Sequence, residues 1–127
     1  MCSQINEGYR DRFINIHILQ FFIEMEELLE FIKTEHNRLM KFYNFQDKTQ
    51  ITYPMTLKVM EEVGELSQAI LHTNSLQRKE KLEKKDIKLG EEFADVLFTT
   101  LLLAENFNID IKSELKNKIE IIKNRNY

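Results

Sequence analysis

The stretch Met60–Ile70, MEEVGELSQAI, contains acidic and apolar residues at spacings that fit the turns of one α-helix. Four apolar residues here and just before it recur at the spacing i, i+4, i+7 and i+11 that forms a stripe on an α-helix: Val59, Val63, Leu66 and Ile70. At 100° per residue, Glu62 and Glu65 lie about 60° apart beside this stripe. Neighbouring carboxylates at an apolar surface repel one another and lose hydration, so the sequence predicts that something compensates their charge.

A second acidic pair occurs in the sequence EEFADV, where Glu92 and Asp95 are again three residues apart. They belong to a segment that is apolar nearly all round from Val96 to Leu103, which is typical of a helix buried on every side. If the two helices pack antiparallel, four carboxylates converge near the core. Unpaired buried charges cost several kcal/mol each, and ligands that are all oxygen favour a hard cation, Mg²⁺ or Mn²⁺. The predicted metal ligands are Glu62, Glu65, Glu92 and Asp95.

The rest of the chain indicates an all-α protein. Three Gly and one Pro in 127 residues are too few turn-forming residues to connect the strands of a sheet. We expect one domain over residues 1–127, with 1–14 forming a loose N-terminal arm because they show no hydrophobic period. Helices are expected at about 16–43, 54–73 and 87–106, and a short one after Asp110, which is its predicted cap. The first leaves room for a break near 21–24. Pro54 is expected in the first turn of the second helix, and Asp86 as the cap of the third.

Composition narrows the functional classes. The formal net charge of −3 gives no general attraction to nucleic acid or to an anionic membrane, so neither is an expected partner. Cys2 is the only cysteine, which excludes an intramolecular disulfide and a cysteine-rich zinc site. The longest uncharged apolar runs are shorter than a bilayer span, and the N-terminus carries charge where a signal peptide needs apolar residues. We expect a cytoplasmic protein.

The two acidic motifs resemble those of the MazG-like, all-α nucleoside triphosphate pyrophosphohydrolase superfamily. That signature is Glu-Glu-x-x-Glu on one helix and Glu-x-x-Asp on the next, and this chain has EEVGE at 61–65 and EFAD at 92–95. The similarity runs through TLKVMEEVGELSQAI and EEFADVLFTTLLLAENFNIDI and covers about residues 54–125. It implies a fold of the four-helix-bundle type.

The resemblance also implies an activity, the hydrolysis of a nucleoside triphosphate to the monophosphate and pyrophosphate. The family's Mg²⁺ ligands match Glu62, Glu65, Glu92 and Asp95. Glu61 matches the first acid of the signature, and from its place at the edge of the cluster we expect it to orient the attacking water or bind a further ion. Lys118 approximately matches a late basic residue of the family and is assigned to the charge of the departing pyrophosphate.

Three other functional classes share parts of this pattern. A ferritin-like di-iron protein needs Glu-x-x-His pairs, but the residues three after Glu62 and Glu92 are Glu65 and Asp95. A non-catalytic helical interaction module on the same scaffold stays open, and so does a phosphoribosyl-ATP pyrophosphohydrolase. The sequence does not decide which base or sugar is preferred.

The apolar segments also predict assembly. A long first helix and an all-round apolar third helix present more apolar surface than a four-helix monomer of this size covers. We therefore expect a homodimer or homotetramer with the first helix in the interface.

Overall fold

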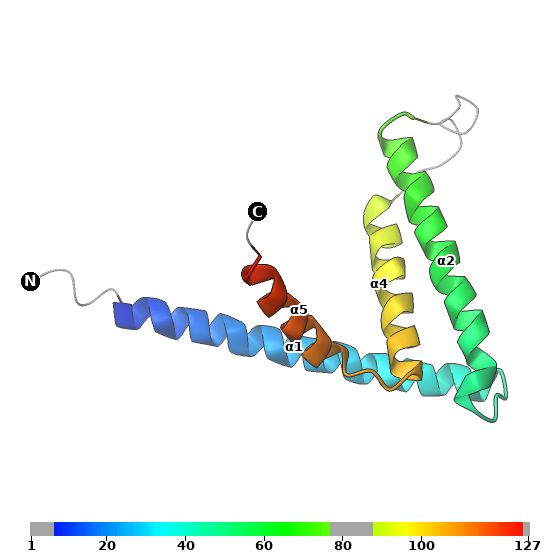
Figure 1. Cartoon of the computed structure of the whole chain (residues 1–127), viewed down its shortest axis with the longest axis horizontal. Helices are drawn as coiled ribbons and strands as arrows, with labels where there is room; N and C mark the ends of the chain where they lie inside the picture. The colour runs from blue at the N-terminus through cyan, green and yellow to red at the C-terminus, as the bar shows by residue number, and fades with distance from the viewer. Residues whose placement is uncertain (1–6, 77–87, 126–127) are drawn as a thin grey trace, which may run out of the picture.

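The computed structural model describes the backbone of residues 7–76 and 88–125, and the side chains from residue 24 onward within those ranges. It contains the helices α1 (Glu7–Phe42), α2 (Lys48–Thr73), α4 (Leu89–Asn106) and α5 (Ile111–Lys123), and the described residues include no strand. The expected all-α fold is confirmed (Figure 1). None of the described helices combines the length and apolarity that a bilayer span requires.

Helix α1 is longer than predicted. It begins at Glu7 and runs without interruption to Phe42, so residues 7–14 are part of this helix and the break near 21–24 is absent. Residues 1–6 lie outside the described ranges. Each residue added to an existing helix gains a backbone hydrogen bond, so a segment without an apolar stripe can still extend one.

Helix α2 begins at Lys48 rather than at Pro54, because Asp47 caps it. The Asp47 carboxylate accepts a hydrogen bond from the backbone N–H of Thr49 at 2.7 Å, and the Gln50 side chain completes a capping box. Pro54 consequently lies inside the helix and not in its first turn, contrary to expectation. The signal was present in the sequence as Asp-x-x-Gln.

The predicted start of the third helix falls partly outside the described residues, which exclude Asp86. Helix α4 begins at Leu89, and Lys88 precedes it without a side-chain capping bond. The expected cap of α5 is confirmed, since Asp110 accepts a hydrogen bond from the backbone N–H of Ser113 at 3.1 Å.

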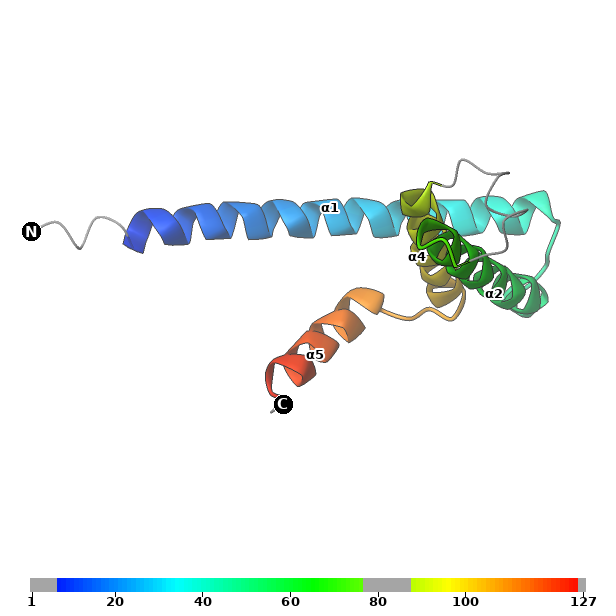
Figure 2. The same cartoon turned by 90° about the horizontal axis from the view of Figure 1, so that it is seen from above.

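Helices α2 and α4 lie side by side and run antiparallel, and α1 crosses this pair at the end where α4 finishes (Figures 1 and 2). Helix α4 packs against both α2 and α1, so it is the central helix, as predicted. The core at the crossing contains one residue of α1, two of α2 and one of α4: Ile32, Ile51, Met55 and Leu102.

Burial of α4 on every side is not observed within one chain. Leu102 and Asn106 are buried, but Phe93 and Leu97 are 49% and 65% exposed. The reason is that α2 and α1 cover only part of the helix, while α5 extends away from the α2–α4 pair and is joined to α1 by an ion pair between Lys112 and Glu26 (Figures 1 and 2).

A buried polar network ties the three packed helices together. His36 of α1 donates through Nε2 to the side-chain oxygen of Asn106 on α4 at 2.9 Å. The Asn106 amide nitrogen donates in turn to the Thr52 hydroxyl at 2.9 Å and to the Lys48 carbonyl at 3.3 Å, both on α2. Since His36 and Asn106 are almost completely buried, loss of one partner leaves polar atoms without hydration.

We predict that Asn106→Ala lowers the free energy of unfolding by about 1–3 kcal/mol, the usual cost of leaving buried polar groups unpaired. Urea denaturation measures this change. The matched control is Asn37→Ala, which alters an exposed asparagine of α1 and should stay within about 0.5 kcal/mol of the unsubstituted protein. Equal stability of the two variants would mean that the network does not hold the helices together.

Candidate metal centre and pocket

Antiparallel packing of α2 and α4 brings together three of the four predicted ligands. Carboxylate oxygens of Glu62, Glu65 and Glu92 lie within 4.8 Å of one another. Glu62 is buried, Glu92 is half-buried and Glu65 is exposed, so the cluster spans the edge of the α2–α4 interface. Its donor set contains only carboxylate oxygen, which fits a hard divalent cation.

The face of α2 that is turned toward the core differs from the apolar stripe that the sequence predicted to be buried. The helix turns Met55, Glu62 and Ala69 toward the core, with exposed fractions of 7%, 5% and 2%, whereas Val63 and Ile70 are 46% and 40% exposed. Glu62 therefore lies on the core-facing line itself and not beside it. This position makes its charge more costly, since fewer water molecules reach the carboxylate.

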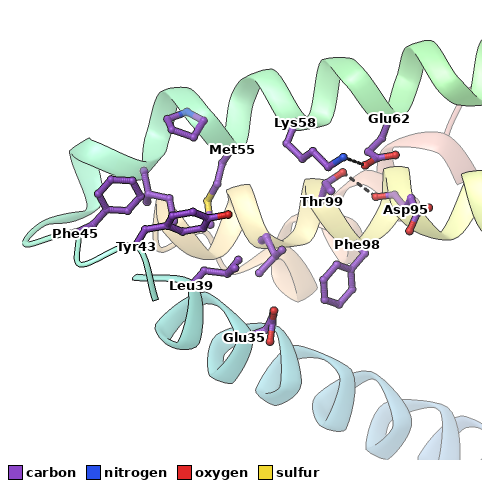
Figure 3. Close-up of a pocket in the computed structure, with 13 residues that line it drawn as sticks. Glu35, Leu39, Tyr43, Phe45, Met55, Lys58, Glu62, Asp95, Phe98 and Thr99 are labelled. Carbon is purple, nitrogen blue, oxygen red and sulfur yellow. Dashed lines mark hydrogen bonds and ion pairs between the residues drawn. The ribbon is translucent and has the colours of Figure 1, made fainter. Parts of the chain in front are cut away.

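Part of the required charge compensation comes from Lys58, which the sequence reading missed. Its ammonium lies 2.5 Å from a carboxylate oxygen of Glu62 (Figure 3) and 3.2 Å from one of Glu61. Hydrogen bonds to Glu62 and then Glu61 raise the pKa of Lys58 above its usual value. The spacing i, i+3 and i, i+4 that joins these residues was visible in the sequence KVMEE.

Asp95, the fourth predicted ligand, is exposed and lies outside the group of three carboxylates whose oxygens converge. It lines the same pocket as Glu62 and Lys58, and Figure 3 shows it one helical turn before Thr99 on α4. The Thr99 hydroxyl donates to the Asp95 carbonyl at 2.7 Å. The structure thus places Asp95 next to the cluster, on the side that faces the pocket.

This pocket has a volume of about 560 Å³ and is formed by α1, α2, α4 and the connection after α1. At one end are the charged groups of Lys58, Glu62 and Asp95 (Figure 3). Toward the other end lie Tyr43 and Phe45, whose rings stack with centroids 5.7 Å apart. The remaining lining residues are mainly apolar: Glu35, Leu39, Ile51, Pro54, Met55, Phe98, Thr99 and Leu102.

Of the two residues predicted for catalysis, one lies near the carboxylate cluster and the other does not. Glu61 is 57% exposed and shares Lys58 with Glu62, which places it at the edge of the cluster. Lys118 is an exposed residue of α5 and is not among the residues that line the pocket. Because α5 extends away from the α2–α4 pair (Figures 1 and 2), the described chain does not bring Lys118 to the carboxylates.

Comparison with known proteins gives one match. The family model of the MazG nucleotide pyrophosphohydrolase domain matches residues 50–126, which is more than half of the chain. No curated protein and no solved structure matches. The matched residues include α4 and α5 and nearly all of α2, and therefore every carboxylate of the cluster.

We predict that Lys58→Met tightens the binding of Mn²⁺ roughly three- to tenfold, because it removes a positive charge that competes for Glu62. Isothermal titration calorimetry with Mn²⁺ alone measures this affinity. Lys123→Met is the matched control, since Lys123 forms an i, i+3 ion pair with Glu120 on α5. Unchanged or weaker binding by Lys58→Met would contradict a competition between the ammonium and the cation.

Proposed function

The chain belongs to the MazG nucleotide pyrophosphohydrolase family, and from this premise we propose that it hydrolyses nucleoside triphosphates to nucleoside monophosphates and pyrophosphate. The observation that carries the proposal is the convergence of Glu62, Glu65 and Glu92 beside a pocket of about 560 Å³. A volume of this size is in the usual range for small-molecule sites.

The residues present fit Mg²⁺ or Mn²⁺. Glu62, Glu65 and Glu92 would hold the cation, and Asp95, which lines the adjoining pocket, would complete the set. When bound, such a cation neutralises phosphate oxygens and lowers the pKa of water, which is the main requirement of phosphoryl transfer. No serine, cysteine or histidine lines the pocket in the described part of the chain, so a covalent intermediate on such a nucleophile is not part of the proposal.

The charged and aromatic ends of the pocket suggest how the substrate would lie in it. The triphosphate would lie at the end that carries Lys58, Glu62 and Asp95, and the nucleobase toward the aromatic end at Tyr43 and Phe45. The stacked rings offer a flat apolar surface suited to a base. This direction supports a nucleotide over a small inorganic phosphate compound, which would leave the aromatic end empty.

Two charged residues of α2 have proposed roles at the phosphate end. Lys58 is 49% exposed and has a flexible stem, so its ammonium is free to move from Glu62 to phosphate oxygens when the carboxylate is otherwise occupied. Glu61, at the edge of the cluster, is suited to orient the attacking water. With Lys58 in this position, a basic residue from α5 is not required to offset the charge of the pyrophosphate.

The reaction is tested by hydrolysis in ¹⁸O-labelled water with a panel of ribo- and deoxyribonucleoside triphosphates, with phosphoribosyl-ATP included. We predict that the products are a monophosphate and pyrophosphate and that the label enters the monophosphate. Label found only in pyrophosphate would place attack at the β-phosphorus, and release of orthophosphate would refute the reaction class. Absence of turnover across the panel would favour a non-catalytic interaction module.

Substitutions of the acids should separate their roles. We predict that Asp95→Asn loses almost all activity and that Glu61→Gln retains a measurable rate, since a water-orienting group is worth about 10² to 10⁴ in rate. Glu91→Gln is the control, because Glu91 is an exposed acid next to Glu92 that pairs with Lys88. Steady-state rates decide the question, and full activity in Asp95→Asn would remove it from the site.

We also propose that the protein is a homodimer or homotetramer. Helix α2 exposes apolar residues on the face opposite α4, where Tyr53, Leu57 and Met60 are 78%, 65% and 66% exposed. Helix α1, expected in the interface, adds Phe31 at 55% exposure. Surface of this kind on adjoining helices is typical of an assembly interface.

Light scattering at micromolar concentration tests the assembly. We predict a mass of at least twice 15.3 kDa for the unsubstituted chain, and a smaller mass for Met60→Glu, which places a charge in the exposed apolar face of α2. Glu27→Gln, on the exposed surface of α1, is the control and should have the same mass as the unsubstituted protein. A monomer in the unsubstituted protein would refute the proposal.

A further inference from the structure

Glu35 is a charged residue of the pocket that the proposed metal centre does not use. It comes from α1, whereas the converging carboxylates come from α2 and α4. Its side chain is only 17% exposed and lines the pocket together with Leu39 and Phe98. Figure 3 shows the Glu35 carboxylate rising from α1 toward α4, between the charged and the aromatic ends.

Arg38 is the hydrogen-bonding partner of the Glu35 carboxylate. The guanidinium donates from Nε to one oxygen at 2.7 Å and from Nη2 to the other at 2.6 Å. This bidentate hydrogen bonding lowers the pKa of Glu35, so the carboxylate is ionised at neutral pH. An ionised carboxylate offers about four lone-pair positions and no donor, and two of those positions remain after Arg38 is bound.

Within the part of the chain that the structure describes, the remaining lone pairs meet no protein donor. The described hydrogen bonds of Glu35 are those from Arg38, and the neighbouring lining residues Leu39, Phe98 and Leu102 are apolar. Burying an acceptor in such a place is costly unless a donor meets it. A ligand that displaces water from this wall must therefore offer N–H or O–H groups.

We propose that Glu35 is a specificity-determining residue that makes the pocket favour nucleobases with an exocyclic amino group over uracil and thymine. This inference rests on the proposed function, since it assigns Glu35 to the base of the same substrate. Glu35 reaches the pocket between its charged and aromatic ends, so a base stacked toward Tyr43 and Phe45 would present an edge to it.

The chemistry of the bases supports this preference. Guanine offers adjacent N1–H and N2–H donors, which match the two oxygens of a carboxylate, and cytosine and adenine each offer an amino group. Uracil and thymine offer a single N3–H flanked by two carbonyl oxygens, and these oxygens repel a carboxylate. A site that presents an acceptor to a bound base discriminates against a base that offers no donor there.

Equilibrium binding tests the inference without turnover. The probes are non-hydrolysable α,β-imido analogues of dGTP, dCTP, dATP, dUTP and dTTP, each with Mg²⁺. We predict that the unsubstituted protein binds the amino-bearing analogues about 10- to 100-fold more tightly than the uracil and thymine analogues. This ranking is measured on the native chain, so the test does not depend on how a variant folds.

Substitutions test whether the Glu35 carboxylate is the group that causes the base preference. Glu35→Gln supplies a donor as well as an acceptor, and we predict that it reduces the preference at least about tenfold while its affinity for Mn²⁺ is unchanged. Arg38→Met breaks the same ion pair from the exposed side and should keep most of the preference, because the carboxylate remains. Glu30→Gln, an exposed acid of α1 outside the pocket, is the charge control and should match the unsubstituted protein.

The outcomes separate this inference from the proposed function. Failure of every analogue to bind the unsubstituted protein would refute both. Binding with equal affinity for all bases, or a preference that Glu35→Gln leaves intact, would overturn the role of Glu35 while the pyrophosphohydrolase proposal stands. Loss of the preference in Arg38→Met to the same extent as in Glu35→Gln would assign the effect to the ion pair and contradict direct recognition by the carboxylate.

Discussion

The repulsion among carboxylates at the α2–α4 interface is the constraint on which the rest of the structure depends. Glu62 is almost completely buried, and oxygens of Glu65 and Glu92 lie close to it. Like charges at such separations are tolerated only with a nearby cation. Lys58 supplies one positive charge from within the chain, and a divalent ion would supply the remainder. The fold thus holds three carboxylates close together at the edge of the pocket, where a cation would offset their charge.

The other packed elements keep this cluster beside the pocket. The network through His36, Asn106 and Thr52 fixes α1 across the end of the α2–α4 pair, at the end opposite the start of α4, where Glu92 lies. Because α1 is anchored there, its Glu35 and the following Tyr43 reach the pocket. Ile51, Met55 and Leu102 belong both to the core at the crossing and to the wall of the pocket, so the packing that holds the helices together also shapes the pocket.

Much of this was predictable from sequence. Helical spacing alone grouped Glu62 with Glu65 and Glu92 with Asp95, and the few Gly and Pro residues indicated the all-α fold. The capping box at Asp47 was equally visible, but Pro54 was given more weight as a start signal. Lys58 followed from simple i, i+4 spacing and was overlooked. By contrast, the approach of α1 to the site depends on a crossing between helices that no local pattern encodes, so Glu35 carried no sequence signal. The role of Lys118 rested on a family resemblance and stays a prediction.

The most direct test of the central claim is a crystal structure of the protein soaked with Mn²⁺, with anomalous scattering recorded at the manganese edge. The account predicts an anomalous peak among the carboxylates of Glu62, Glu65 and Glu92, with oxygen ligands and with the Lys58 ammonium withdrawn from Glu62. A peak elsewhere, or the absence of a peak with the ion pair between Lys58 and Glu62 intact, would contradict it.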